Sequence, residues 1–534
     1  MSDSKTTKSG EQVLEVLVED SAHSDCERPL GSSGEYDLTL ISSEDAEFLV
    51  SYPKTAHKKI LRKMDWRIVP VLAMLYFLAI LDRNNIANAK IEGMEEELQL
   101  YGSRYNVALC VFYPTYILAA HVKRPSWYLG GLTFSWGLVA TMHGFIQSYE
   151  GLVAARIVLG ALEGGLYPAG VYLISVWYLP RESQTRLSGL YFGNGAAGAI
   201  SGLLAYAIAH MEGIGGFLAW RWIFIVEGLA SVIVGICGFA LLPDSPAQSR
   251  RWLRPEEIRY LEVRQRATPG RKSHGREREV SEEGKGAKYI ALLDRDSWKM
   301  VWSAVSAWNV FAMGLIYMCF SAPTVALKFN LPQIVRDMGT AKGSASIAQL
   351  LTIPPFAMGL VATFGLAQLW DRYKLRRLDL AIGCGVMTVV AHAVLFAYSP
   401  TQDAHIGETY FAICLAAAGM FTIIPTLESW LIANLAPARR RSVGIGYYVC
   451  WGNVGSIIGT FMYRDSEAPT YPTGYGTAFS LAGLGVVLAC FVEWRYWRIN
   501  RKRQKLSKGE ILSTYTEEEL DVLGDRSPLF RYSY

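Results

Sequence analysis

The chain has 534 residues, of which 51% are hydrophobic and 19% are charged. A soluble chain carries charge on about a quarter of its residues, whereas here long stretches carry almost none, which excludes an ordinary soluble protein and indicates membrane spans. The formal net charge of +4 comes from 52 basic and 48 acidic residues, too even a balance for a nucleic-acid-binding protein with a basic stripe.

Twelve apolar segments of span length follow one another along the chain. Each leaves room for a tilted helix of about 20 to 25 residues and a short turn. We therefore predict an all-α membrane protein with twelve transmembrane helices in two six-helix halves. The predicted spans cover residues 66–86, 105–121, 126–147, 151–178, 186–210, 219–242, 301–327, 344–370, 376–398, 407–434, 440–462 and 474–497.

Polar stretches divide the chain into five parts. They predict a disordered N-terminal tail at 1–65, a first half at 66–242, a linker at 243–299, a second half at 300–498 and a C-terminal tail at 499–534. The linker is rich in charge, so we expect it to be disordered or amphipathic. Two halves that pack about a central cavity are typical of secondary transporters built from internal repeats.

Basic residues flank the first and the last span. Because Lys and Arg concentrate on the cytoplasmic side of a membrane, both termini are expected in the cytoplasm. The short loops 148–151, 210–218 and 399–408 contain neither Lys nor Arg and are expected outside. We expect the protein in the plasma membrane. The flanking basic residues are Lys54, Lys58, Lys59, Arg62, Lys63, Arg67, Arg498, Arg501, Lys502, Arg503, Lys505 and Lys508.

The predicted fourth span carries two ionisable residues, Arg156 and Glu163. A separation of seven residues brings both side chains onto one face of a helix. Ionisable groups within a membrane are costly and mark functional sites. A carboxyl placed between burial and nearby cations suits proton coupling. The alternative is a structural ion pair with neighbouring helices.

Further charged residues lie within or at the ends of other spans. Asp82 and Arg83 close the first span, and the planar donor fork of an arginine matches a carboxylate, which favours an anionic solute. The alternative is an interfacial pair that marks the helix end. Glu428 in the tenth span is a candidate lining residue of the cavity, whereas Glu227 is expected to pair with basic loop residues.

An ordered set of stretches resembles the fungal anion:cation symporter family of the major facilitator superfamily, the group of allantoate, nicotinate, pantothenate and biotin permeases. The resemblance covers roughly residues 60–500 and implies a twelve-helix fold with proton-driven movement of small organic anions. The stretches include LDRNNIANAKIEGMEEELQL (81–100), RIVLGALEGGLYP (156–168), WRWIFIVEG (220–228) and WGNVGSIIG (451–459).

Related galactonate and vesicular glutamate transporters place an acid–arginine pair at the end of the first span and a glutamate in the fourth. Asp82, Arg83 and Glu163 match those positions. The resemblance implies that Arg83 binds the substrate carboxylate, while Asp82 and Glu163 take and release protons. Asn453 in the eleventh span matches a polar position that contacts substrate.

The sequence departs from that family after the second span. The chain runs from Ala119 directly into the basic residues Lys123 and Arg124, and about ten residues that the family usually has are missing. The loop signature that latches the cytoplasmic side is therefore absent from the first half. This predicts either altered gating or a chain that has lost transport competence.

We predict a proton-coupled symporter of a small carboxylate such as nicotinate, pantothenate or allantoate. Its partners are the carboxylate, protons and the lipid bilayer, with no nucleic acid, and a monomer is expected. No nucleophile–base or metal-binding pattern is visible, so we expect no enzyme, no catalytic residue, no metal and no cofactor. The alternatives are an exporter of an organic acid or secondary metabolite, and a non-transporting sensor or inactive variant.

Overall fold

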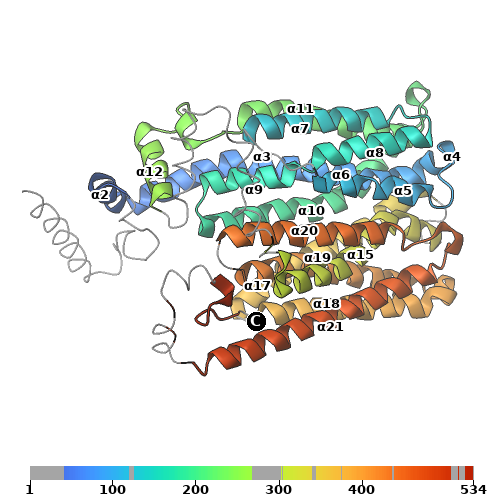
Figure 1. Ribbon diagram of the computed structural model, residues 1–534. Coiled ribbons are helices and arrows are strands. Elements are labelled where there is room, and N and C mark those ends of the chain that lie inside the picture. Colours follow the sequence, from blue (N-terminus) through green and yellow to red (C-terminus); the bar gives the residue numbers. More distant parts are fainter. Residues whose placement is uncertain are drawn as a thin grey trace, which may run out of the picture.

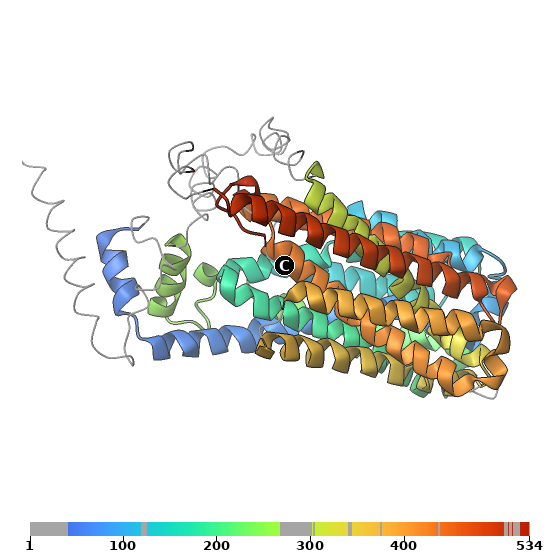
Figure 2. The ribbon, with the colours of Figure 1, turned by 90° about the horizontal axis from the view of Figure 1, so that it is seen from below.

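A long bundle of helices, side by side along one axis, makes up the chain (Figures 1 and 2). The structure is a computed structural model that describes residues 41–118, 125–267, 302, 305–339, 344–373, 376–435, 438–506, 511, 515 and 524–532. Helices α2 (Ser43–Ser51) and α12 (Pro255–Arg266) lie at one end of the bundle, which we call the tail end. We call the opposite end the far end.

Six spans form the first half. Two of them are divided, the second at Val111 and the fourth at Gly164 and Gly165. In chain order the helices are α3 (Lys54–Ala89), α5 (Arg104–Cys110) with α6 (Phe112–Leu118), α7 (Pro125–His143), α8 (Tyr149–Glu163) with α9 (Leu166–Trp177), α10 (Pro180–Ala209) and α11 (Ala219–Leu241).

Six further spans form the second half, on the opposite side of the bundle in Figure 1. They are α15 (Trp308–Asp337), α16 (Ala345–Leu350) with α17 (Ile353–Tyr373), α18 (Arg377–Tyr398), α19 (Ile406–Ala433), α20 (Ala438–Thr460) and α21 (Pro472–Arg503). Within the described part of the chain, eight helical segments are individually long and apolar enough to cross a membrane. The predicted arrangement of twelve helices in two halves is confirmed.

Short links complete the fold at the ends of these helices. At the far end, the π-helical turn η4 (Lys90–Met94) and α4 (Glu95–Glu97) follow α3. The remaining short turns are η5 (Ile214–Gly216), η6 (Pro246–Gln248), η8 (Ser399–Ala404), η9 (Asp465–Glu467) and η10 (Gly524–Arg526).

Glycines let the helices of the first half approach each other closely. A Cβ atom on Gly160 would lie 2.3 Å from the carbonyl oxygen of Phe112, and one on Gly164 would lie 2.2 Å from that of Tyr116. Both glycines therefore hold the fourth span against α6. Close packing of small residues stabilises membrane helices, which have little hydrophobic driving force between them. This packing brings Glu163 next to the end of α3.

The prediction of a disordered tail over 1–65 is wrong for residues 43–65, which form α2 and the first turns of α3. Ile60 and Met64 recur four residues apart and are buried, so this stretch is amphipathic rather than merely polar. It packs on α12, where the rings of Tyr52 and Tyr260 stack with centroids 4.0 Å apart.

Part of the linker is ordered too, because α12 supplies this apolar partner to the tail. The prediction for residues 1–40 and 268–299 lies outside the described residues. The shortened segment also falls there: α6 ends at Leu118, α7 begins at Pro125, and residues 119–124 between them are not described. Within the C-terminal tail, Tyr532 stacks on Tyr496 of α21 with ring centroids 4.3 Å apart.

Candidate substrate and proton site

Two of the predicted site residues, Arg83 and Glu163, form an ion pair inside the first half. Nε of Arg83 on α3 donates to Oε2 of Glu163 on α8 at 2.8 Å. The Glu163 side chain is fully buried, whereas 17% of the Arg83 side chain is exposed. The guanidinium lies 4.5 Å from the ring centroid of Tyr116 and 5.0 Å from that of Phe112. A cation in this aromatic setting remains accessible to an anion.

Asp82, the neighbour of Arg83, points into a different environment. Its Oδ2 accepts hydrogen bonds from Trp136 Nε1 at 3.1 Å and from Ser231 Oγ at 3.0 Å. Its Oδ1 is buried and has no hydrogen-bond partner among the described residues. Asp82 is therefore anchored between α7 and α11, with one oxygen left to carry a proton.

Arg156 is buried on the same helix as Glu163. Its Nε and Nη2 have no hydrogen-bond partner within the described part of the chain. It lies near Asp82 and Glu163 and interacts electrostatically with both. Lys328 on α15 interacts in the same way with Arg83 and Glu163. The position of Lys328 within an apolar helix is the signal by which the sequence could have indicated it.

Glu428 faces the first half from α19. The hydroxyl of Tyr167 on α9 donates to its Oε1 at 3.2 Å, which joins the two halves in the middle of the bundle. Tyr76 lies near Glu428 and Arg83, and Tyr317 lies near Glu428 and Tyr76. Several tyrosines therefore connect Glu428 to the arginine. Single tyrosines in apolar spans gave no such signal in the sequence.

Asn453 is half-buried on α20. Its Nδ2 donates to the carbonyl oxygen of Val449 in the same helix at 3.0 Å. This hydrogen bond leaves the side-chain carbonyl and one amide N–H free to contact a substrate. Nearby on the same helix, Ser456 lies close enough to Tyr113 of α6 for their side chains to interact. The helix that carries Asn453 therefore borders the first half.

The prediction for Glu227 is wrong. Glu227 forms no ion pair with a basic loop residue among the described residues, and the nearby Arg221 pairs with Glu97 at 2.6 Å. Glu227 is buried, and the side chain of Asn85 lies close enough to interact with its carboxyl group. Glu227 interacts electrostatically with Asp82. The WRWIFIVEG pattern suggested a partner close in sequence, whereas helix packing placed the two acids together.

Polar contacts hold the two halves together at the far end. Lys90 Nζ, after α3, pairs with Asp465 Oδ1 in the second half at 2.8 Å. Gln349 Nε2 on α16 donates to Glu92 Oε1 at 2.9 Å. The hydroxyl of Tyr105 donates to the carbonyl oxygen of Phe329 at 3.4 Å. The structure is therefore closed at the far end.

Comparisons with known proteins agree with this architecture. The sequence profile of the Major Facilitator Superfamily matches residues 72–460. The MFS-type transporter cnsO of Penicillium expansum is 32% identical, with 89% of this chain and 90% of the relative covered. An uncharacterized transporter of Schizosaccharomyces pombe is 34% identical, with the same coverage. The major facilitator-type transporter hxnP of Emericella nidulans is 27% identical over 89% of this chain and 93% of its own.

Solved structures share the fold. The D-xylose-proton symporter has a TM-score of 0.54 at 17% identity and covers 80% of this chain and 96% of its own. The inward open xylose transporter XylE from E. coli has a TM-score of 0.56 at 15% identity, with 80% and 95% covered. Family, relatives and fold are those of multi-pass membrane transporters of small molecules, and the chain belongs to the Major Facilitator Superfamily.

Proposed function

We propose that the protein couples the movement of a small organic anion to protons by alternating access. The observation that carries the proposal is the buried ion pair between Arg83 and Glu163. A guanidinium binds a carboxylate through two parallel hydrogen bonds, and here one carboxylate of the protein already occupies part of that donor set. A substrate carboxylate must therefore compete with Glu163 for Arg83.

Protonation of Glu163 resolves this competition. A neutral carboxylic acid holds the guanidinium less strongly than a carboxylate does, so proton uptake frees Arg83 for the substrate. The reverse also holds, since an anion on Arg83 disfavours a second negative charge at Glu163. Anion and proton binding are then mutually favourable, as a symporter requires. Asp82, which has an unpartnered oxygen, and Arg156, which interacts electrostatically with both acids, complete the proton-coupling group.

The same group combines basic and acidic side chains in a buried setting. Three basic side chains, Arg83, Arg156 and Lys328, lie near the buried acids Asp82, Glu163 and Glu227. Burying an uncompensated charge is costly. An incoming anion therefore binds best together with a proton. Glu428 and Asn453 would contact the rest of the substrate from the second half.

The far-end contacts supply the conformational part of the proposal. With both termini in the cytoplasm of a plasma-membrane protein, the far end faces outward, and the structure represents a state closed to the outside. An Arg83–Glu163 pair without a bound anion fits a binding site that has released its substrate inward. A tenfold proton ratio contributes about 1.4 kcal/mol per proton, enough to accumulate the anion about tenfold. A potential of 100 mV adds about 2.3 kcal/mol only for each net positive charge that enters, and one proton with one monovalent anion carries none.

Uptake into cells that express the full chain tests the proposal. Labelled nicotinate, pantothenate, allantoate and biotin are compared in acidic and neutral medium, with and without a protonophore. We expect acid-stimulated, protonophore-sensitive uptake of at least one of them. Glu163→Gln should abolish this uptake while anion exchange persists, and the matched control Glu150→Gln, an exposed acid on the same helix, should transport normally.

Normal gradient-driven uptake by Glu163→Gln would remove Glu163 from the coupling group. Protonophore-insensitive uptake would reject proton coupling. Efflux of the anion against its gradient, without uptake, would support the alternative of an exporter. Binding without flux in either direction would support a non-transporting sensor.

A further inference from the structure

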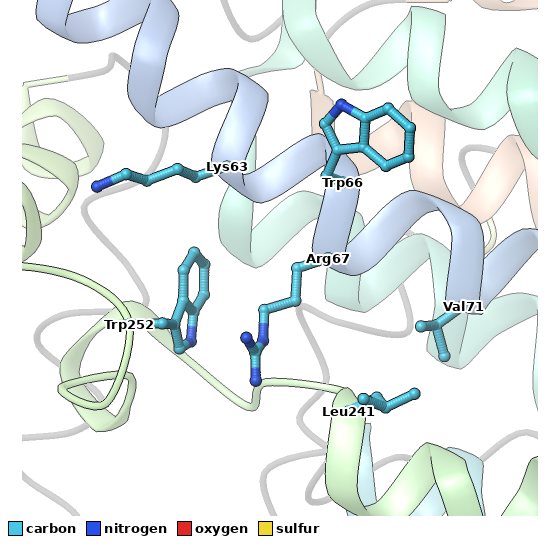
Figure 3. Close-up of a pocket in the computed structure, with 6 residues that line it drawn as sticks. All are labelled: Lys63, Trp66, Arg67, Val71, Leu241 and Trp252. Atoms are coloured by element: carbon cyan, nitrogen blue, oxygen red, sulfur yellow. The ribbon is translucent and has the colours of Figure 1, made fainter.

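A pocket of about 510 Å³ lies at the tail end, outside the group proposed for transport. It lies between residues 63–71 of α3, the last residue of α11 and the segment that leads into α12 (Figure 3). Its lining combines two basic, two indole and two aliphatic side chains. They are Lys63, Trp66, Arg67, Val71, Leu241 and Trp252.

The basic side chains of the pocket differ in how they are engaged. Lys63 Nζ pairs with Glu257 Oε1 of α12 at 2.6 Å. Arg67 forms no ion pair with any residue that the structure describes, and its guanidinium lies 5.3 Å from the ring centroid of Trp252. Figure 3 shows the Arg67 and Trp252 side chains next to each other below α3. Arg67 is therefore a cation available to an anion at an aromatic wall.

The pocket lies where the apolar outer surface of the bundle ends. Along α11 the exposed residues Leu229, Ile233 and Ile236 follow one helix face, and Leu241 is the last residue of that helix. Their spacing and exposure are those of a face in contact with lipid tails. The two basic residues of the pocket, Lys63 and Arg67, lie beyond the end of this face. Trp66, which also lines the pocket, is 78% exposed. Tryptophan is enriched at the headgroup level of membranes.

We propose that this pocket binds one anionic phospholipid from the leaflet at the tail end. The phosphate would lie against Arg67 and Lys63, the indole of Trp252 would cover the glycerol region, and an acyl chain would follow Val71 and Leu241. A soluble phosphate could use the cations but would leave the aliphatic side chains exposed, so the mixed lining favours a lipid. The proposal does not depend on which solute the protein transports.

A lipid at this place would join two parts of the chain. Trp252 stacks on Trp177 of α9 with ring centroids 5.5 Å apart, and it precedes α12, which holds α2. The phospholipid would therefore bridge the first span and the segment that carries the α2–α12 unit. Anionic lipid should stabilise the docked position of this unit.

Native mass spectrometry of the full chain in detergent tests the proposal, with phosphatidylserine as the probe and phosphatidylcholine as the neutral comparison. We expect one phosphatidylserine to bind more tightly than phosphatidylcholine. Arg67→Gln should weaken phosphatidylserine binding about fivefold, since a basic residue near anionic lipid contributes ~1 kcal/mol. Arg67→Lys should retain most of the binding. The matched control Arg62→Gln removes a charge from an exposed position of the same helix that does not line the pocket and should bind normally.

A phosphatidylserine with a photoreactive acyl chain then locates the lipid. We expect cross-links on peptides that contain Val71 or Leu241, and fewer of them in Arg67→Gln. Equal losses in Arg67→Gln and Arg62→Gln would overturn the proposal, as would equal binding of the two lipids. Full protection from cross-linking by soluble glycerol phosphate would instead identify a site for a free phosphate and would also overturn it.

Discussion

Replacing Asp465 by Asn should open the far end of the protein. Asp465 in the second half pairs with Lys90 of the first half at 2.8 Å. The Lys90 side chain is 2% exposed and the Asp465 side chain is 32% exposed. Alternating access requires that such contacts break in each cycle, so their strength sets the population of the closed state.

The magnitude follows from the surroundings of Lys90. Removing one partner of a fully buried ion pair costs about 3 to 5 kcal/mol, and a hydrogen bond to a charged group contributes about 1.5 to 3 kcal/mol. Here the partner is one-third exposed, and Glu95 at 3.8 Å and the ring of Tyr105 at 4.5 Å remain as neighbours. The loss is therefore about 2 kcal/mol, which corresponds to a shift of roughly thirtyfold toward the state open at the far end.

Distances between spin labels measure this shift. Ile214 in η5, between α10 and α11, and Thr401 in η8, between α18 and α19, are exposed, and each would carry a label in a background without native cysteines. We expect a longer-distance population to grow in Asp465→Asn. The control Glu96→Gln removes an exposed acid that has no ion pair among the described residues and should leave the distances unchanged. An unchanged distribution in Asp465→Asn, or an equal shift in both variants, would refute the reasoning.

Three further predictions follow from the packing and the charges. Gly164→Ala places a Cβ 2.2 Å from a carbonyl oxygen of α6 and should cost about 1 to 3 kcal/mol; the melting temperature should fall, whereas Gly170→Ala, with its nearest neighbour at 4.0 Å, should leave it unchanged. Arg83→Lys loses the donor fork and should raise the apparent Kd of the anion at least tenfold, and an unchanged Kd would remove Arg83 from the site. Burial lowers the pKa of His57 below its ordinary value of 6.5. When the α2–α12 unit undocks, His57 regains its ordinary pKa and binds more protons. Docking of the unit should therefore weaken as the pH falls below 6.5. Hydrogen exchange of α2, corrected for intrinsic rates, should be faster at pH 5.5 than at pH 7.5, and His57→Gln should remove the difference.

Sequence reasoning reached the fold because span length is a local property. About 20 apolar residues are needed to cross a bilayer, so twelve segments could be counted without knowing how they pack. The polar segments near the ends of the chain were less predictable than the spans. The polar residues around Met64 look like a tail until the apolar partner on α12 is known, since only packing decides whether a short amphipathic stretch forms a stable helix.

The candidate site was predicted in part. Asp82, Arg83 and Glu163 were found because each is ionisable within or at the end of an apolar segment. The ion pair between Arg83 and Glu163 was not visible, because 80 residues separate its members. Glu227 was misassigned for the same reason, as its neighbour Asp82 comes from another helix.

Proton movement driven by the anion alone tests the central claim most directly. Proteoliposomes that contain the full chain enclose a pH-sensitive dye, start without a pH gradient and receive the anion identified by uptake, with the membrane potential clamped. The account predicts acidification of the lumen as the anion enters, and no acidification with Glu163→Gln although that variant still exchanges anion. Anion entry without acidification in the unaltered protein, or equal acidification by Glu163→Gln, would contradict it.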